Sequence, residues 1–249
     1  MKFPVLPKNM VAIGQNEPFV FDCHKGVDCF THCCRQLDLA LAPYDVLRLK
    51  NALGMHSAQF LDNYVIIERE DGEVFPRFYL TMVDDGNASC VFVTKDGCSL
   101  YPDRPGACRA YPMGRASMRQ PDGSIEDQYV LLNEEHCHGF AESGKQTPLE
   151  YSRQQGFDKY NSINDVLIPV LQHEKIRDGM QLNEQQVALF TLALYDLDTF
   201  RDKLFSAALD AAPPDAAEQE RLNDDEALLL FAVTWLKSEL FKDTTDASG

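Results

Sequence analysis

Four cysteines crowd into twelve positions near the start of the chain, in the stretch FDCHKGVDCFTHCC at residues 21–34. Thiolates held this close together repel one another unless a cation lies between them, and a bound metal supplies that cation while it deprotonates the thiols. Burial as small apolar side chains explains scattered cysteines well and such a cluster badly. The crowding therefore predicts metal ligation, with a redox dithiol site and plain burial as the alternatives.

The remaining cysteines follow at longer intervals, and none comes after Cys137. An even count does not indicate disulfides here, because a reducing cytosol disfavours them. Eight thiols make two four-coordinate sites or one cluster with spare ligands, and the sequence leaves open which four share a site. The predicted metal ligands are Cys23, Cys29, Cys33, Cys34, Cys90, Cys98, Cys108 and Cys137. Weaker candidates are the neighbouring histidines His24, His32, His136 and His138.

The charge balance argues against a nucleic-acid partner. Asp and Glu number 39 against 23 Lys and Arg, a formal net charge of −16, whereas phosphate contacts require clustered Lys and Arg. No segment approaches the roughly 20 apolar residues that span a bilayer. The N-terminal stretch MKFPVLPKNMVAIGQNEPF contains prolines and no continuous apolar run, so it is a poor match to a signal peptide. We therefore expect a cytoplasmic protein with no membrane partner.

The first 146 residues mix short strands and short helices. The run from Pro43 to Gly54 has helical spacing and ends on a helix-stopping glycine. A second short helix follows, with Ser57 as its expected N-cap. The loops between the elements carry the cysteines. Strand-like pieces bounded by turn signals are predicted at 65–70, 74–83, 90–93 and 128–133.

The rest of the chain is helical in pattern. After an interruption near Gly156, the amphipathic stretches 183–209 and 216–241 are each predicted to form one helix. The predicted fold class is α+β, with a small cysteine-rich metal-binding core of short strands and helices followed by an α-helical C-terminal region. We expect a cysteine-cluster domain at 1–146 and a helical region at 147–249 that packs on it.

Two arginines flank Cys108 in the segment DGCSLYPDRPGACRAYP. The charges of Arg104 and Arg109 would offset the negative charge that remains when four thiolates surround one Zn²⁺ or an iron–sulfur cluster. Pairing with nearby carboxylates such as that of Asp103 is the alternative. The tyrosine hydroxyls of this segment, including that of Tyr111, are expected to serve packing before chemistry.

These motifs resemble a known family. The spaced cysteines that end in Cys33-Cys34, the run CVFVTKDGCSLYPDRPGACRAYP and the later Cys137-x-Gly139 resemble the YkgJ-type cysteine-cluster family (CxxCxxCC), which is described as a zinc- or iron-chelating domain. The resemblance covers about residues 20–165. The first cluster departs from the family pattern, with five and three intervening residues where the pattern has two and two. The resemblance implies metal binding, and some relatives are associated with flagellin lysine N-methylation that uses S-adenosylmethionine.

The identity of the metal and the biological role are separate questions. All-sulfur ligation suits Zn²⁺ and iron–sulfur clusters alike. The CxxC knuckle typical of structural zinc is absent from the sequence and the thiols are in excess, so we favour an iron–sulfur cluster over Zn²⁺. Three roles fit: a metal-binding protein with a structural or redox centre and an unknown protein partner, a protein-lysine N-methylase-like enzyme, or a metal chaperone. No GxGxxG loop follows a strand, which weakens the enzyme alternative.

Overall fold

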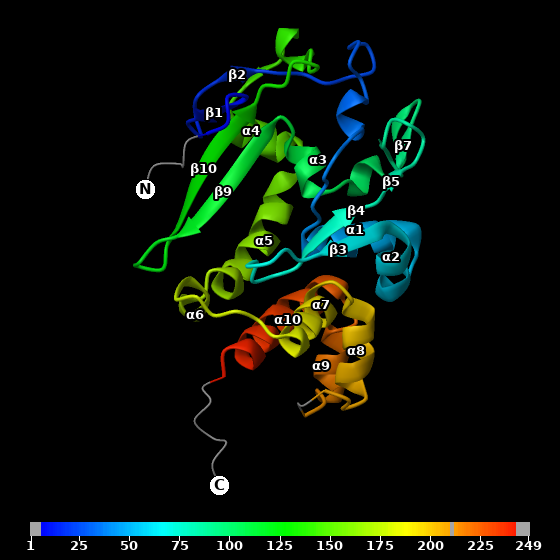
Figure 1. Ribbon diagram of the computed structural model, residues 1–249, viewed down its shortest axis with the longest axis vertical. Helices are drawn as coiled ribbons and strands as arrows, with labels where there is room; N and C mark the ends of the chain where they lie inside the picture. Colours follow the sequence, from blue (N-terminus) through cyan, green and yellow to red (C-terminus); the bar gives the residue numbers. More distant parts are fainter. Residues whose placement is uncertain (1–5, 210–211, 243–249) are drawn as a thin grey trace. The chain divides into compact units, whose positions relative to one another are not determined.

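The computed structural model describes residues 6–209 and 212–242, and the chain divides into two compact units (Figure 1). Each unit combines two segments of the chain. The first consists of Met1–Leu41 and Leu80–Ser162, and the second of Ala42–Tyr79 and Ile163–Gly249. These units divide the chain at other points than the expected domains 1–146 and 147–249, which stay a prediction.

An antiparallel three-stranded sheet is the largest regular element of the first unit (Figure 1). Its central strand β10 (Ile125–Leu132) lies between β1 (Met10–Ile13) and β9 (Met113–Arg119). The strand predicted at 128–133 is β10, whereas the sequence did not indicate β9. The β9 sequence MGRASMR lacks the β-branched residues that favour strands, and the strand forms because it pairs with β10 along its length.

Pairs of two-residue strands hold the loops that carry the cysteines. β2 (Phe19–Val20) pairs with β11 (Lys145–Gln146), β5 (Met82–Val83) with β6 (Ser89–Cys90), and β7 (Val93–Thr94) with β8 (Gly97–Cys98). Gly97 has a φ of 111°, a conformation that glycine adopts without strain, and it closes the tight turn between β7 and β8. Short helices complete this unit: η1 (His32–Cys34), η2 (Tyr101–Asp103), α3 (Gly106–Ala110), η3 (Gly139–Ala141) and α4 (Pro148–Gln154).

A mainly aromatic core buries the segment that precedes Cys23, the first cysteine in the chain. Phe19, Phe21, Met113, Tyr129 and Tyr151 are buried together. The rings of Phe21 and Tyr151 meet edge to face, with 6.0 Å between their centroids. This core fixes the chain up to residue 21, so that the loop beginning at residue 22 starts from a rigid point.

The second unit is mainly helical. The helix predicted from Pro43 is confirmed as α1 (Pro43–Leu53), and Gly54 ends it with a φ of 62°. β3 (Val65–Glu68) pairs with β4 (Arg77–Leu80), whose last residue falls in the first unit, and α5 (Phe157–Leu171) passes from one unit into the other. The other helices are α2 (Ser57–Tyr64), α6 (Glu174–Arg177), α7 (Glu184–Leu194), α8 (Leu197–Phe205), α9 (Ala216–Arg221) and α10 (Asp225–Leu240).

Ser57 explains two errors in the helix predictions. His56 and not Ser57 is the N-cap of α2. The Ser57 hydroxyl donates a hydrogen bond to Asp196 Oδ1 at 2.6 Å and accepts one from the Asp198 amide at 2.9 Å. These bonds compete with helical hydrogen bonding, so the stretch 183–209 is divided into α7 and α8. The stretch 216–241 is also two helices, because the Asp224 side chain caps a new start at α10.

A buried ion network joins α1, α8 and α10 in the second unit. Lys50 is only 4% exposed, and its ammonium group bonds Asp198 and Asp225, each at 2.9 Å. Arg201 bonds the same two carboxylates. Burial by itself would raise the pKa of these carboxyls, but hydrogen bonds from Lys50 and other donors hold the pKa of both below its ordinary value.

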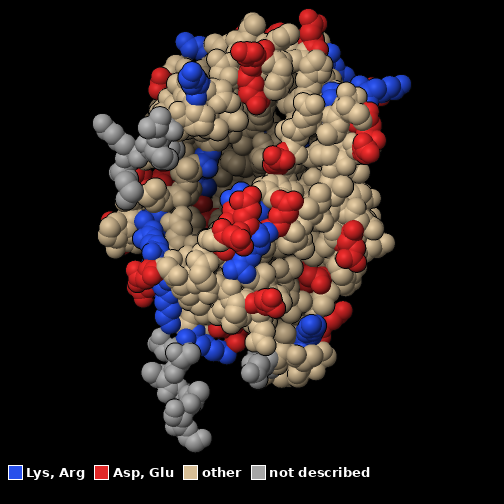
Figure 2. Space-filling model, in the orientation of Figure 1, with Lys and Arg blue, Asp and Glu red and all other residues tan. Residues whose placement is uncertain are grey.

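The α+β class is confirmed, with short strands and helices around the cysteines and helices toward the C-terminus. No helix within the described residues is both long and apolar enough to cross a membrane. On the face shown in Figure 2, Lys and Arg side chains lie among Asp and Glu side chains.

Candidate metal centre

Two glycines bring together the segments that carry the first and the last cysteine. The Phe21 amide donates to the Gly144 carbonyl at 2.8 Å, and the Asp22 amide to the Gly139 carbonyl at 3.1 Å. A Cβ on Gly139 would lie 2.5 Å from Phe21 Cε2 and 2.7 Å from Asp22 O, and a Cβ on Gly144 would lie 2.7 Å from Phe21 O. The two backbones therefore approach at a distance that only glycine permits.

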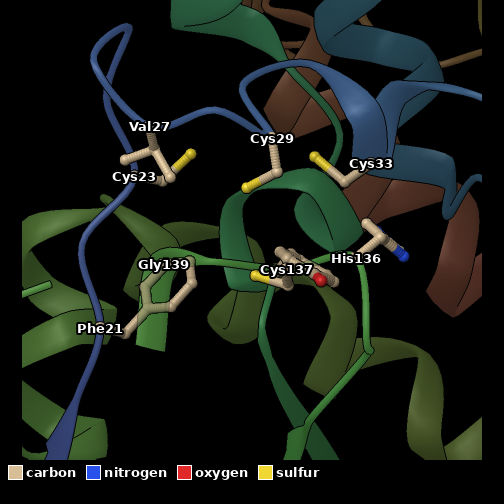
Figure 3. A pocket seen from close by; sticks show the side chains of 9 residues that line it. Phe21, Cys23, Val27, Cys29, Cys33, His136, Cys137 and Gly139 are labelled. Atoms are coloured by element: carbon tan, nitrogen blue, oxygen red, sulfur yellow. The ribbon is translucent and has the colours of Figure 1, made fainter. Parts of the chain in front are cut away.

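Four thiols line one pocket in this region (Figure 3). Three of them come from the segment that follows β2, and the fourth comes from the segment before η3. The pocket encloses about 10 Å³, room for one water-sized sphere. Its lining consists of Cys23, Cys29, Cys33 and Cys137 with Phe21, Val27, Tyr111, His136 and Gly139.

Cys29 joins the two segments through its sulfur. The side chain is buried, and its Sγ accepts a hydrogen bond from the His138 backbone amide, with 3.2 Å between N and S. This amide belongs to the residue after Cys137, so the bond holds two of the pocket thiols in one local arrangement. An amide directed at sulfur stabilises the thiolate in preference to the thiol.

In the absence of a cation, the surroundings of Cys23 and Cys33 favour the protonated form of these two thiols. Burial raises the pKa of Cys23 to about 11, and the charges of the other three pocket thiols contribute. Although Cys23 is exposed as a residue, its sulfur is directed toward the pocket (Figure 3). A hydrogen bond with the Cys34 side chain, followed by burial, raises the pKa of Cys33. A bound cation reverses this preference because it stabilises the thiolate form.

The four sulfurs converge without adopting the geometry of a coordinated ion. Across 6–209 and 212–242, no group of three or more His, Cys, Asp or Glu side chains is arranged so that it could hold a metal ion. Tetrahedral zinc with Zn–S bonds of about 2.3 Å would need sulfurs about 3.8 Å apart. The donor set nevertheless fits a thiophilic metal, because thiols dominate the polar lining and no carboxylate belongs to it. The thiols would have to rotate toward a common centre on binding.

Tyr111 and Glu134 form a polar edge that the sequence reasoning missed. The Tyr111 hydroxyl donates to Glu134 Oε2 at 2.8 Å, and burial followed by hydrogen bonds to Cys137 and Glu134 raises the pKa of Tyr111. His136 lies with its Nε2 3.7 Å from Glu134 Oε2, and its side chain is directed away from the sulfurs in Figure 3. The acidic residues before Cys137 in EEHCHGF were the available signal.

The other candidate histidines lie outside the pocket lining. His24 Nδ1 accepts a hydrogen bond from the Gly26 amide at 3.0 Å, and its Nε2 lies 3.5 Å from Glu142 Oε2. His32 begins η1. His138 contributes its backbone amide to Cys29. The His24 contacts support a structural role for that side chain, and the His138 contact involves its backbone alone.

Cys34 does not line the pocket but lies next to Cys33, which does. Its side chain forms a hydrogen bond with that of Cys33. The next residue, Arg35, forms an isolated bridge with Ser89. Because Ser89 precedes Cys90, this bridge places Cys34 beside the hairpin that carries other cysteines.

Cys90 and Cys98 form a second thiol group on the short hairpins. Burial raises the pKa of both thiols, and the charge of Cys98 contributes to the shift of Cys90. The backbone amides of Phe92 and Val93 oppose the rise in the pKa of Cys90, and the amide of Leu100 opposes the rise in the pKa of Cys98. Neither residue lines the pocket described above.

The two arginines have neutral partners. Arg104 donates to the Tyr101 carbonyl at 2.7 Å and the Gln155 side-chain oxygen at 2.6 Å. Arg109 donates to the Gln155 carbonyl at 2.7 Å and to the Pro102 carbonyl. Each guanidinium also lies over an aromatic ring, Arg104 at 3.8 Å and Arg109 at 4.7 Å from the ring centroid. Among the described residues, the expected alternative of pairing with a carboxylate is not seen for either side chain.

An α+β scaffold that gathers free thiols from distant segments defines a class of cysteine-rich domain for thiophilic metals. Residues 22–138 match the model of the CxxCxxCC family, "Putative zinc- or iron-chelating domain". Comparisons with curated proteins and with solved structures found no match. The resemblance predicted from the motifs is therefore confirmed, while the eight individual ligands stay a prediction.

Proposed function

We propose that this chain is a thiolate metal-binding protein whose first centre, named here the pocket centre, consists of Cys23, Cys29, Cys33 and Cys137. One observation carries the proposal: four sulfurs from segments more than one hundred residues apart line one small pocket. A fold does not assemble four thiols from distant segments for packing alone, because any apolar side chain of similar size would pack as well. The family match agrees with this chemistry.

The surroundings of the pocket centre suit a thiolate site. Phe21 and Val27 are 3% and 5% exposed, so the walls limit the access of water. A low-dielectric wall strengthens the attraction between thiolates and a cation. The amide of His138 at the Cys29 sulfur supplies part of the outer support that metal ligands need. When bound, the metal would supply the positive charge that lets all four thiols ionise.

For the metal we propose an iron–sulfur cluster, with Zn²⁺ as the competing occupant. The sequence lacks the CxxC knuckle of structural zinc, and its eight thiols exceed the four that one zinc site needs. The enclosed volume of about 10 Å³ favours one ion instead. We give the number and sequence spacing of the cysteines more weight, because rotation of the cysteine side chains that border the pocket would change the enclosed volume.

A second candidate function is metal transfer, and the exposure of Cys23 favours it. An exposed ligand can exchange with an incoming thiol, whereas an enclosed site retains its metal. The free thiols also fit a reducing compartment such as the cytoplasm. Transfer predicts that an external chelator removes the metal within minutes from the folded native protein. Retention over hours would support a structural or redox centre.

The test of the pocket centre is the metal content of variants purified without oxygen. Cys29→Ser and Cys137→Ser should each lose the metal of this centre, and the visible spectrum with the acid-labile sulfide content distinguishes a cluster from zinc. Met118→Ser is the control, since this side chain is exposed on β9 in the same unit. Unchanged metal content in both cysteine variants, at native far-UV circular dichroism, would overturn the proposal.

A further inference from the structure

Strand β10 extends beyond one of the two strands that pair with it. β9 pairs with β10 as far as Ile125, the first residue of β10. β1 ends earlier, at Ile13, which lies opposite Tyr129 (Figure 1). Residues 125–128 therefore have β9 on one side and, among the described residues, no strand on the other. This open side is named here the free edge of β10.

The backbone of β10 presents unpaired hydrogen-bonding groups at the free edge. The Asn133 amide, directly after β10, donates to the Asn9 carbonyl on the β1 side. Successive residues of a strand direct their N–H and C=O groups to opposite sides, so Ile125 and Asp127 direct theirs to the β1 side as well. Within the part of the chain that the structure describes, these groups have no hydrogen-bond partner. Such an edge is a template for a further strand.

A groove follows the free edge where the chain turns away after β1. The Glu17 amide donates to the Gly14 carbonyl at 2.8 Å, and this turn removes the chain from the space beside residues 125–128. The groove has a volume of about 330 Å³ and is bordered by residues 12–15 and 127–129. Ligand sites commonly have volumes of roughly 300–1,000 Å³. The free edge therefore has space beside it for an extended segment of another chain.

The charges beside the groove favour a basic occupant. Glu126 accepts a hydrogen bond from a glutamine side chain, and Glu17 accepts one from the Gly14 amide, so both carboxylates have neutral donors. Asp127 pairs with Arg115 at 2.8 Å, but this arginine belongs to β9, on the other side of β10. The free edge is therefore acidic. The formal net charge of −16 attracts basic partners over a longer range.

A second copy of the chain fits the free edge poorly. Two copies related by a two-fold axis would present the same four residues to each other. When the two edges overlap fully, Glu126 and Asp127 of one copy lie opposite an acidic residue of the other. Like charges directly opposite each other destabilise a strand pair. Basic residues at the same positions of a different chain would convert this repulsion into attraction.

We propose that the free edge of β10 binds an extended basic segment of a partner protein, which adds a strand antiparallel to β10 and in line with β1. In this arrangement two successive basic side chains lie opposite Asp127 and Glu126, and an apolar side chain lies opposite Ile125, which is 43% exposed. Main-chain hydrogen bonds supply affinity and the side-chain pairs supply selectivity. The site goes beyond metal binding and shares no residue with the pocket centre.

The test measures the binding of a fluorescein-labelled synthetic peptide, Thr-Val-Lys-Lys-Val-Thr-Val, to the full chain by fluorescence anisotropy. One control peptide carries N-methyl groups on the first lysine and on the valine after the second lysine, so it keeps the charge and loses two strand donors. It should bind about tenfold more weakly. A second control has glutamates in place of the lysines and should not bind. Equal binding of any control, or no binding of the lysine peptide, would overturn the proposal.

Two variants of one residue test the position of the added strand. Ile125→Pro removes the N–H that faces the free edge and keeps the bonds to β9, because proline is tolerated where its nitrogen faces away from the neighbouring strand. Ile125→Val keeps the N–H and the strand propensity. The affinity for the lysine peptide should fall about tenfold in Ile125→Pro and stay within about twofold in Ile125→Val, with native metal content in both. Equal affinity in the two variants would refute binding at this edge.

Hydrogen exchange on the native chain covers the case in which Ile125→Pro does not fold. The lysine peptide should slow the exchange of the Ile125 and Asp127 amides about tenfold and that of the Gln128 amide, which faces β9, much less. Unchanged exchange at Ile125 and Asp127 would contradict strand addition. Sedimentation of the chain without peptide tests the other occupant. A dimer that Ile125→Pro dissociates would assign the free edge to a second copy and overturn the basic partner.

Discussion

Replacing Gly139 by alanine tests how the two segments of the pocket centre are held together. The added methyl would lie 2.5 Å from Phe21 Cε2 and 2.7 Å from Asp22 O, against ordinary contacts of 3.4–4 Å. The segment must therefore move by roughly 1 Å. This movement loses the Asp22–Gly139 hydrogen bond, about 1 kcal/mol, and overpacks buried Phe21, about 1–3 kcal/mol. The free energy of unfolding of the first unit should fall by about 2–4 kcal/mol.

The assay combines urea unfolding followed by circular dichroism with native-state hydrogen exchange at the Phe21 and Asp22 amides. Because Cys23 follows Asp22 directly, the metal content should fall together with the protection of these amides. The matched control is Gly14→Ala, where the added Cβ meets nothing closer than 3.6 Å, and its stability should stay within about 0.5 kcal/mol of the native value. If Gly139→Ala matches this control in stability and metal content, the close approach does not position the pocket centre.

Three further predictions concern the ion network and the metal. Lys50→Met removes the ammonium group that Asp198 and Asp225 share and leaves Arg201 as their remaining cation, so it should cost about 1.5–3 kcal/mol in urea unfolding; a loss below about 1 kcal/mol, as for an exposed pair, would contradict the network. The pKa values of Asp198 and Asp225 are lower in the folded protein than the ordinary value of an aspartate. Their ionised forms therefore stabilise the folded protein fully above that ordinary pKa, and this stabilisation is lost as pH falls through the two lowered pKa values. The native protein should therefore lose stability below about pH 4, and Lys50→Met should lose less over the same interval; equal acid dependence in both proteins would refute this cause. Removal of the metal by a chelator should lower the melting temperature of the native chain, since a ligand at 100 times its Kd stabilises by about 2.7 kcal/mol; an unchanged melting curve would contradict a metal bound to the folded state.

The sequence indicated a zinc- or iron-chelating domain, in agreement with the family match, and it did not indicate which thiols line one pocket. Crowded cysteines indicate ligation because thiolates repel, and this reasoning needs no fold. Which thiols meet depends on contacts such as that between the Cys29 sulfur and the His138 amide, across more than one hundred residues. The strands that create these contacts, such as β2 and β11, have two residues each. Two residues are too few for a periodic pattern to appear.

The errors in the helical region have a similar origin. The stretch 183–209 has continuous amphipathic spacing, and no local signal in it is strong enough to end a helix at Leu194. The division comes from the Ser57 hydroxyl, which binds Asp196 and the Asp198 amide from a segment far away in the sequence. Tertiary hydrogen bonds override local propensity here, and a single sequence does not reveal them.

X-ray absorption spectroscopy at the iron and zinc edges, on the native chain purified without oxygen, tests the central claim most directly. The thiolate account predicts a shell of about four sulfur atoms at about 2.3 Å from the metal, with additional iron–iron scattering if a cluster is present. A metal surrounded by nitrogen and oxygen atoms alone would contradict it. So would a protein that contains no metal after growth with iron and zinc.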